Sequence, residues 1–257
     1  MWWRVLSGIA MMNIVLWLTL GLRAKAALNR QTVLCGIYVF VCAFRSFLPR
    51  ADVQRFCLVD SWWSTVFVGR SVATVGELAF MAQAAAFLYL LGQAAGSRAA
   101  MRLAQCVVPI IALAECCSWY AVITTNFIGN TCEESLWAIA ATVLLAGFIS
   151  VWPKAPKPVL ISSYVAIPAY IAFMMTVDVP MYFNRWRADL ADGKQFFGLS
   201  DGLHDLTHRW VVTFSWADWS TEIPWMTAYF SFAVWLSLAM MVLSRRFATR
   251  FEQPSRS

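Results

Sequence analysis

Seven stretches of mostly apolar residues, each roughly 20 residues long or longer, follow one another along the 257-residue chain. A helix of that length crosses about 30 Å of hydrocarbon. The predicted spans are 5–22, 32–49, 62–92, 103–125, 135–152, 159–181 and 222–244. Only 13% of the residues are charged, against about 25% in soluble domains, which excludes an ordinary cytosolic enzyme. We expect an all-α integral membrane protein: a seven-transmembrane-helix bundle forming one polytopic domain over 1–257.

The positions of Lys and Arg predict the orientation of this bundle, because cytoplasmic loops retain an excess of basic residues. The first, third and fifth loops and the segment 245–257 are basic, whereas the fourth loop, 126–134, has no basic residue and two acidic ones, Glu133 and Glu134. This places the N-terminus outside and the C-terminus, with its basic tail 245–257, in the cytoplasm. A cleaved signal peptide is an alternative for the first stretch, but Arg23 and Lys25 directly after it oppose translocation of that end. The localisation that we expect is the bacterial inner (plasma) membrane.

The expected partners follow from the same charges. The net charge of +6 is explained by inner loops next to anionic lipid headgroups, so membrane lipids are expected partners and nucleic acid is not. Another membrane protein is a further candidate partner.

The long segment 185–220 is rich in aromatic residues and is predicted to be an amphipathic outer interfacial loop that lies over the bundle before the last span. Trp prefers the interfacial zone of a membrane. Ten of the 14 tryptophans fall at or beyond predicted outer span ends: Trp2, Trp3, Trp62, Trp63, Trp137, Trp186, Trp210, Trp216, Trp219 and Trp225. They form either an aromatic belt or a shallow outer pocket for a lipid tail, quinone, isoprenoid or pigment.

Four charged residues inside predicted spans are the candidate ligand-binding residues: Arg70, Glu77, Glu115 and Asp178. Charges at membrane depth are costly and usually face the bundle interior or a water-filled cavity. Glu77 follows Arg70 by two helical turns and therefore points the same way, about 10 Å deeper. Three interpretations remain open: a structural ion-pair network in which Arg70 pairs with Asp178, Glu222 or Asp60, a polar socket for a ligand, and a proton-handling carboxylate. Arg45 lies near a span end and is expected to reach the headgroups.

The two histidines, His204 and His208, are four residues apart and have Asp201 and Asp205 beside them. On a helix both imidazoles would project from one face, a spacing that can bind a divalent metal with one further ligand. Local hydrogen bonding on an interfacial helix is the alternative. The pair is similar to the C-terminal histidine pair of the seven-helix ceramidase and adiponectin-receptor hydrolases, but this chain lacks their third histidine, so membership is not assigned.

Other cofactors are restricted by the sequence. A seven-span layout resembles that of the rhodopsins, but every lysine falls in a predicted loop, which excludes a retinal Schiff base. The two histidines lie outside the predicted spans, which excludes haem held by paired intramembrane histidines. Of the seven cysteines, Cys57 and Cys132 fall in predicted outer loops, where a disulfide is permitted.

These features predict a membrane protein that handles a small apolar or amphipathic, lipid-like ligand in a polar pocket open to the outer leaflet. A membrane-embedded lipid-modifying enzyme is one form of this function. The alternatives are a non-catalytic accessory or scaffold subunit of a membrane complex, and a proton-coupled transporter or pH sensor. Whether the chain is an enzyme is left open.

Overall fold

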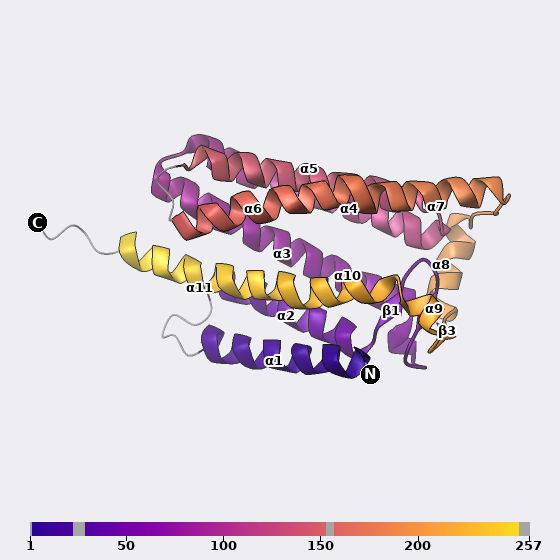
Figure 1. Ribbon diagram of the computed structural model, residues 1–257. Helices are drawn as coiled ribbons and strands as arrows, with labels where there is room; N and C mark the ends of the chain where they lie inside the picture. The colour runs from indigo at the N-terminus through magenta and orange to yellow at the C-terminus, as the bar shows by residue number, and fades with distance from the viewer. Residues whose placement is uncertain (1, 23–28, 153–156, 252–257) are drawn as a thin grey trace, which may run out of the picture. The chain divides into compact units, whose positions relative to one another are not determined.

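The structure is a computed structural model that describes residues 2–22, 29–152 and 157–251, and helices dominate it (Figure 1). The long helices are α1 (Trp2–Leu22), α2 (Arg30–Phe47), α3 (Val66–Ala95), α4 (Arg98–Thr124), α5 (Ile128–Ser150), α6 (Lys157–Phe173), α7 (Val179–Ala191) and α11 (Val234–Phe251). The shorter ones are α8 (Leu199–His208), α9 (Trp216–Trp219), α10 (Glu222–Ala228) and the 3₁₀ turn η1 (Trp62–Ser64). Two π-helical turns, η2 (Met174–Asp178) and η3 (Tyr229–Ala233), join α6 to α7 and α10 to α11.

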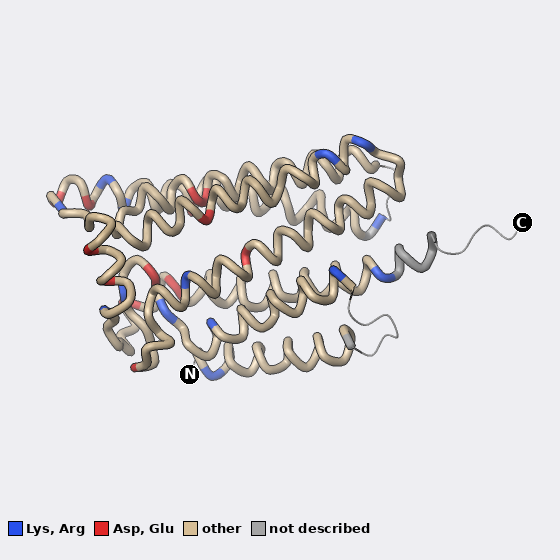
Figure 2. Tube along the Cα trace, turned by 180° about the vertical axis from the view of Figure 1, so that it is seen from behind, with Lys and Arg blue, Asp and Glu red and all other residues tan. Residues whose placement is uncertain are grey.

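Six helical segments are long and apolar enough to cross a membrane, which confirms an all-α membrane protein. They are Trp2–Gly21, Val66–Ala95, Arg98–Thr124, Ile128–Ser150, Val159–Ala191 and Glu222–Arg245. The remaining predicted span, 32–49, corresponds to α2, which is not among the six. Its 18 residues include Arg30, Gln31 and Arg45, which leaves a short apolar stretch. Charged residues gather toward the helix ends, and few interrupt the helices elsewhere (Figure 2).

The helix bounds differ from the predicted spans at several ends. The helix predicted over 159–181 continues through η2 and α7 to Ala191, so the segment 185–220 begins within a helix. Its 33 membrane-type residues span about 50 Å, more than the hydrocarbon thickness. The predicted tail 245–257 likewise begins within α11, and 252–257 lie outside the described residues.

The chain divides into two compact units. Unit 1 comprises 1–51, 55–87 and 210–257, and unit 2 comprises 52–54 and 88–209. In unit 1, helices α1, α2 and α11 pack on one another. Strands β1 (Arg50–Ala51) and β2 (Phe56–Cys57) pair antiparallel, and β3 (Val211–Val212) joins β2 in parallel. We call the end of unit 1 that carries these strands its strand end.

The core of unit 1 is apolar but contains buried polar residues that bridge helices, among them Asn13 and Gln83. Asn13 donates to the Phe230 carbonyl and accepts from the Trp235 indole N–H. Gln83 donates to the Ser237 carbonyl at 2.9 Å and accepts a hydrogen bond from the Ser237 hydroxyl. Buried amides with paired donors and acceptors fix which helix faces meet.

Unit 2 is built on the antiparallel pair α4 and α5, with α6 and α7 packed on α5 and α8 on α4. Gly129 lets the two helices of the pair approach closely, because a β-carbon there would lie 2.6 Å from the Cys117 carbonyl oxygen. Thr125 ends α4 in the left-handed conformation, and α5 begins three residues later. The polar segment predicted as loop 126–134 is therefore mostly helical.

Candidate functional site

Arg70 and Glu77 form a buried ion pair on α3. Their side chains approach to 2.8 Å between Nη2 and Oε2, and both residues are more than nine-tenths buried. The long Arg70 side chain covers the two helical turns between them, as expected for residues on one helix face. A buried pair with this geometry keeps both charges compensated, and removing either partner would leave a costly buried charge.

Arg45 is also buried, at 5% exposure, so the prediction that it reaches the headgroups is wrong. Its guanidinium lies 5.6 Å from the Phe230 ring centroid and 5.9 Å from that of Trp225. The Trp225 indole N–H in turn donates to Glu222 at 2.7 Å. Cation–π contacts with desolvated rings replace part of the lost hydration of Arg45.

Two tyrosines complete this arrangement. Tyr38 on α2 and Tyr229 in η3 have ring centroids 5.9 Å apart in an edge-to-face geometry. Their buried hydroxyls approach each other, but within the described residues neither completes a hydrogen bond. Tyr229 interacts electrostatically with both Glu77 and Arg45. The residues Tyr38, Arg45, Arg70, Glu77 and Tyr229 thus form one group, which we call the unit 1 polar cluster.

The helices that carry this cluster are held closely at the strand end. Gly69, next to Arg70 on α3, faces the Arg50 side chain, and a β-carbon there would lie 2.3 Å from Arg50 Nη1. Gly76, next to Glu77, is packed against Val41 of α2 in the same way. The glycines beside Arg70 and Glu77 therefore bring α3 close to the rest of unit 1.

The other two predicted ligand-binding residues, Glu115 and Asp178, lie in unit 2. Glu115 is buried on α4, where its carboxylate lies within 4.8 Å of that of Glu133 on α5. Asp178 is half-buried and ends the π-helical turn η2. Such turns recur at functional positions in helices.

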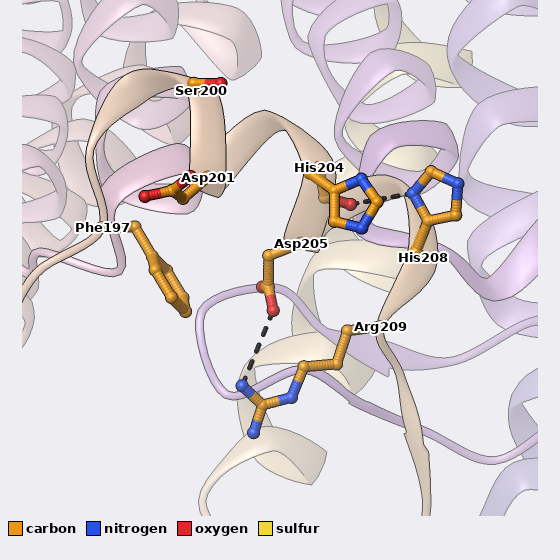
Figure 3. Close-up of a pocket in the computed structure, with 7 residues that line it drawn as sticks. All are labelled: Phe197, Ser200, Asp201, His204, Asp205, His208 and Arg209. Atoms are coloured by element: carbon orange, nitrogen blue, oxygen red, sulfur yellow. Dashed lines mark hydrogen bonds and ion pairs between the residues drawn. The ribbon is translucent and has the colours of Figure 1, made fainter.

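The histidines lie on a helix, α8, which meets the condition for their projecting from one face. Their rings stack with centroids 4.3 Å apart, and His208 Nδ1 lies 3.0 Å from the His204 carbonyl oxygen. Both line a shallow hollow of about 550 Å³ (Figure 3), together with Phe197, Ser200, Asp201, Asp205 and Arg209. Neither histidine belongs to a set of three ligand side chains within 4.8 Å of one another in the described chain. Metal binding at this pair stays a prediction.

The predicted Cys57–Cys132 disulfide is absent, because all seven cysteines lie in described residues and all are free thiols. Cys57 is buried at the strand end of unit 1, where its thiol donates to the Val59 carbonyl oxygen. Burial raises the pKa of the Cys57 thiol above its ordinary value. Cys132 lies exposed on α5.

The predicted tryptophan belt is divided in the structure. Trp62, Trp63 and Trp216 are more than half exposed, as an interfacial position requires. Trp219 is 4% exposed and packs edge-to-face on Phe56, so it is a core residue of unit 1.

Sequence reasoning missed Tyr38, Tyr229 and Glu133. The two tyrosines lie within apolar spans, where an aromatic residue gives no signal of its own. Glu133 was assigned to an outer loop, whereas α5 begins earlier and buries it. No family model, curated protein or solved structure matches this chain.

Proposed function

We propose that this protein binds a small amphipathic, lipid-like molecule whose polar end contacts the unit 1 polar cluster. The observation that carries the proposal is the pair of buried tyrosine hydroxyls, Tyr38 and Tyr229, that complete no hydrogen bond within the described chain. A buried hydroxyl without a partner costs free energy of about 1–3 kcal/mol. A ligand oxygen that accepts hydrogen bonds from both hydroxyls would remove this cost.

The surroundings favour a polar end with acceptor oxygens, such as a phosphate, carboxylate or hydroxyl group. Arg45 interacts electrostatically with Tyr229, and Arg70 forms an ion pair with Glu77 of the same cluster. Guanidinium groups donate to carboxylate and phosphate oxygens in a planar, two-pronged geometry. The apolar remainder of the ligand would contact the aromatic side chains around Tyr229.

The finer form of the proposal includes seven spans, an external N-terminus and access from the outer leaflet. Exposed aromatic residues at the strand end, among them Trp62, Trp63 and Trp216, support an interfacial position for that end. A membrane-embedded enzyme that modifies the bound lipid is a further form of the same proposal.

The test is ligand binding by a variant that loses one hydroxyl and no volume. Tyr229→Phe should weaken binding of phosphatidylglycerol by about tenfold, since a hydrogen bond to a charged group contributes about 1.5–3 kcal/mol. Its melting temperature should stay the same or rise. Native mass spectrometry of the gently solubilised protein measures retained lipid, with phosphatidylcholine as the headgroup comparison.

Tyr164→Phe is the matched control. It removes a hydroxyl that donates to the Phe148 carbonyl in unit 2, so it should lower stability and leave lipid retention unchanged. Arg70→Gln should reduce both the stability and the lipid retention of the protein. If Tyr229→Phe and a folded Arg70→Gln protein retain lipid as the wild type does, the cluster is a structural ion-pair network and the proposal is wrong.

A second candidate function is that of an accessory subunit in a membrane complex. It is favoured by Phe214 and Trp216, which are 79% and 72% exposed two residues apart. Replacing both with alanine should release a partner that co-purifies with the wild type. An unchanged set of co-purifying proteins would argue against this function.

A further inference from the structure

We infer that unit 2 holds a cation site between α4 and α5, formed by the carboxylates of Glu115 and Glu133, the amide oxygen of Asn130 and the hydroxyl of Ser118. This site shares no residue with the unit 1 polar cluster. Its test measures Mn²⁺ binding, whereas the test of the lipid proposal measures lipid retention, so the two proposals are judged on separate readouts.

The packing of α4 on α5 sets these residues opposite one another. Gly129 lies against Cys117 and Ala121, which fixes the register of the antiparallel pair. One turn further along α5 corresponds to one turn back along α4. Glu133 therefore faces Glu115, in agreement with the 4.8 Å limit on their carboxylate separation, and Asn130 faces Ser118.

The two carboxylates alone do not define a site, but the neutral oxygens beside them point to a ligand. Asn130 donates from Nδ2 to Glu133 at 3.0 Å, so its amide lies at the carboxylate pair. Its Oδ1 is buried and has no hydrogen-bond partner in the described chain. Ser118 lies one turn from Glu115, on the same face of α4. It is fully buried, and its hydroxyl also has no partner there.

A cation fits this arrangement better than a shared proton. The site gathers two carboxylates and the acceptor oxygen of Asn130 in one buried place, together with a hydroxyl that can turn its lone pairs inward. A proton bridges two of these oxygens, whereas a cation contacts all of them. An all-oxygen set selects hard cations such as Mg²⁺, Ca²⁺ or Mn²⁺ over Zn²⁺ or copper. A divalent ion also balances two carboxylate charges.

The experiment uses the full-length protein in detergent, stripped with a chelator and titrated with Mn²⁺ alone. The electron paramagnetic resonance signal of free Mn²⁺ reports how much ion remains unbound. The background is His204→Ala/His208→Ala, which removes the exposed histidine pair as a competing site. One Mn²⁺ should bind per chain, and Mg²⁺ or Ca²⁺ should displace it.

The variants test the ligand set. Glu133→Gln should weaken Mn²⁺ binding by at least about tenfold, the lower figure for groups that only support a metal ligand. Glu134→Gln is the matched control, because it makes the same change at the next residue, which is only half-buried. Ser118→Ala should weaken binding without loss of folding, since it removes a buried hydroxyl that has no partner.

Three outcomes would overturn the inference. One is wild-type protein that binds none of the three ions. Another is Glu133→Gln and Ser118→Ala proteins that bind Mn²⁺ as Glu134→Gln does. The third is an infrared band of a protonated carboxyl group that disappears in Glu115→Gln and is unaffected by the ions, which would assign a shared proton to the pair.

Discussion

Gly202 on α8 gives a prediction whose sign depends on the structure. In an isolated helix, replacing an interior glycine by alanine is stabilising by about 1 kcal/mol. Within unit 2, however, Gly202 is buried against α4, and a β-carbon there would lie 2.1 Å from the carbonyl oxygen of Ile123. The nearest atoms are backbone, which cannot rotate away. Gly202→Ala should therefore weaken the packing of α8 on α4.

The magnitude follows from the distance. An ordinary contact requires more than 3 Å, so α8 would have to retreat by about 1 Å, which also loosens the packing of Leu206, now fully buried. Overpacking of this kind costs about 1–3 kcal/mol. After subtracting the helix-propensity gain of about 1 kcal/mol, the net loss reaches about 2 kcal/mol. That loss raises the population of detached α8 by up to about thirtyfold.

Amide hydrogen exchange of the peptide 199–208, followed by mass spectrometry, measures this population directly. The control is Gly8→Ala in α1, a helical glycine with no atom within 4 Å of the added β-carbon, where exchange should slow or stay the same. If exchange of α8 also slows in Gly202→Ala, helix propensity dominates, and the close packing of α8 on α4 is refuted.

Three further predictions concern a buried amide of unit 1 and the cysteines of both units. Gln83→Leu should lower the unfolding free energy by about 1–3 kcal/mol, because the buried Ser237 hydroxyl and carbonyl lose the hydrogen bonds that they form with Gln83. Thermal unfolding measures this loss. The double variant Gln83→Leu/Ser237→Ala should recover part of it. Cys57 should react with iodoacetamide more slowly than exposed Cys132 at pH 8. Its rate should keep rising above pH 9.0, the ordinary pKa of a thiol, because burial raises the pKa of Cys57 and its thiolate forms only at higher pH. Peptide mass spectrometry compares the two rates, and equal rates would contradict the burial of Cys57. The denatured, unreduced protein should show seven free thiols.

The helices were largely predictable from the sequence because length and apolar content decide them. The same pattern could not show that Asp178 lies in a π-helical turn or that α7 extends to Ala191, since the polar residues there look like a loop. It also misjudged Asn126 to Glu134, where a left-handed Thr125 reverses the chain in three residues and α5 begins inside the polar stretch.

The site was predictable only in part. Periodicity on one helix places Arg70 and Glu77 on one face, and their ion pair confirms that geometry. It gives no information on which face of a distant helix arrives opposite. The contacts of Tyr229 with Tyr38 and of Ser237 with Gln83 join segments more than 150 residues apart in the sequence, so no local signal could reveal them.

The discontinuity of unit 1 has a consequence for biosynthesis. The first 87 residues are made early, but the closing helices α10 and α11 leave the ribosome only after all of unit 2. Until then, three polar side chains lack contacts that they make in the folded protein. Asn13 lacks the Phe230 carbonyl, Arg45 lacks the Trp225 ring, and Gln83 lacks Ser237. A chain that stalls before residue 210 therefore carries polar side chains on its helices that lack the contacts they make in the folded protein.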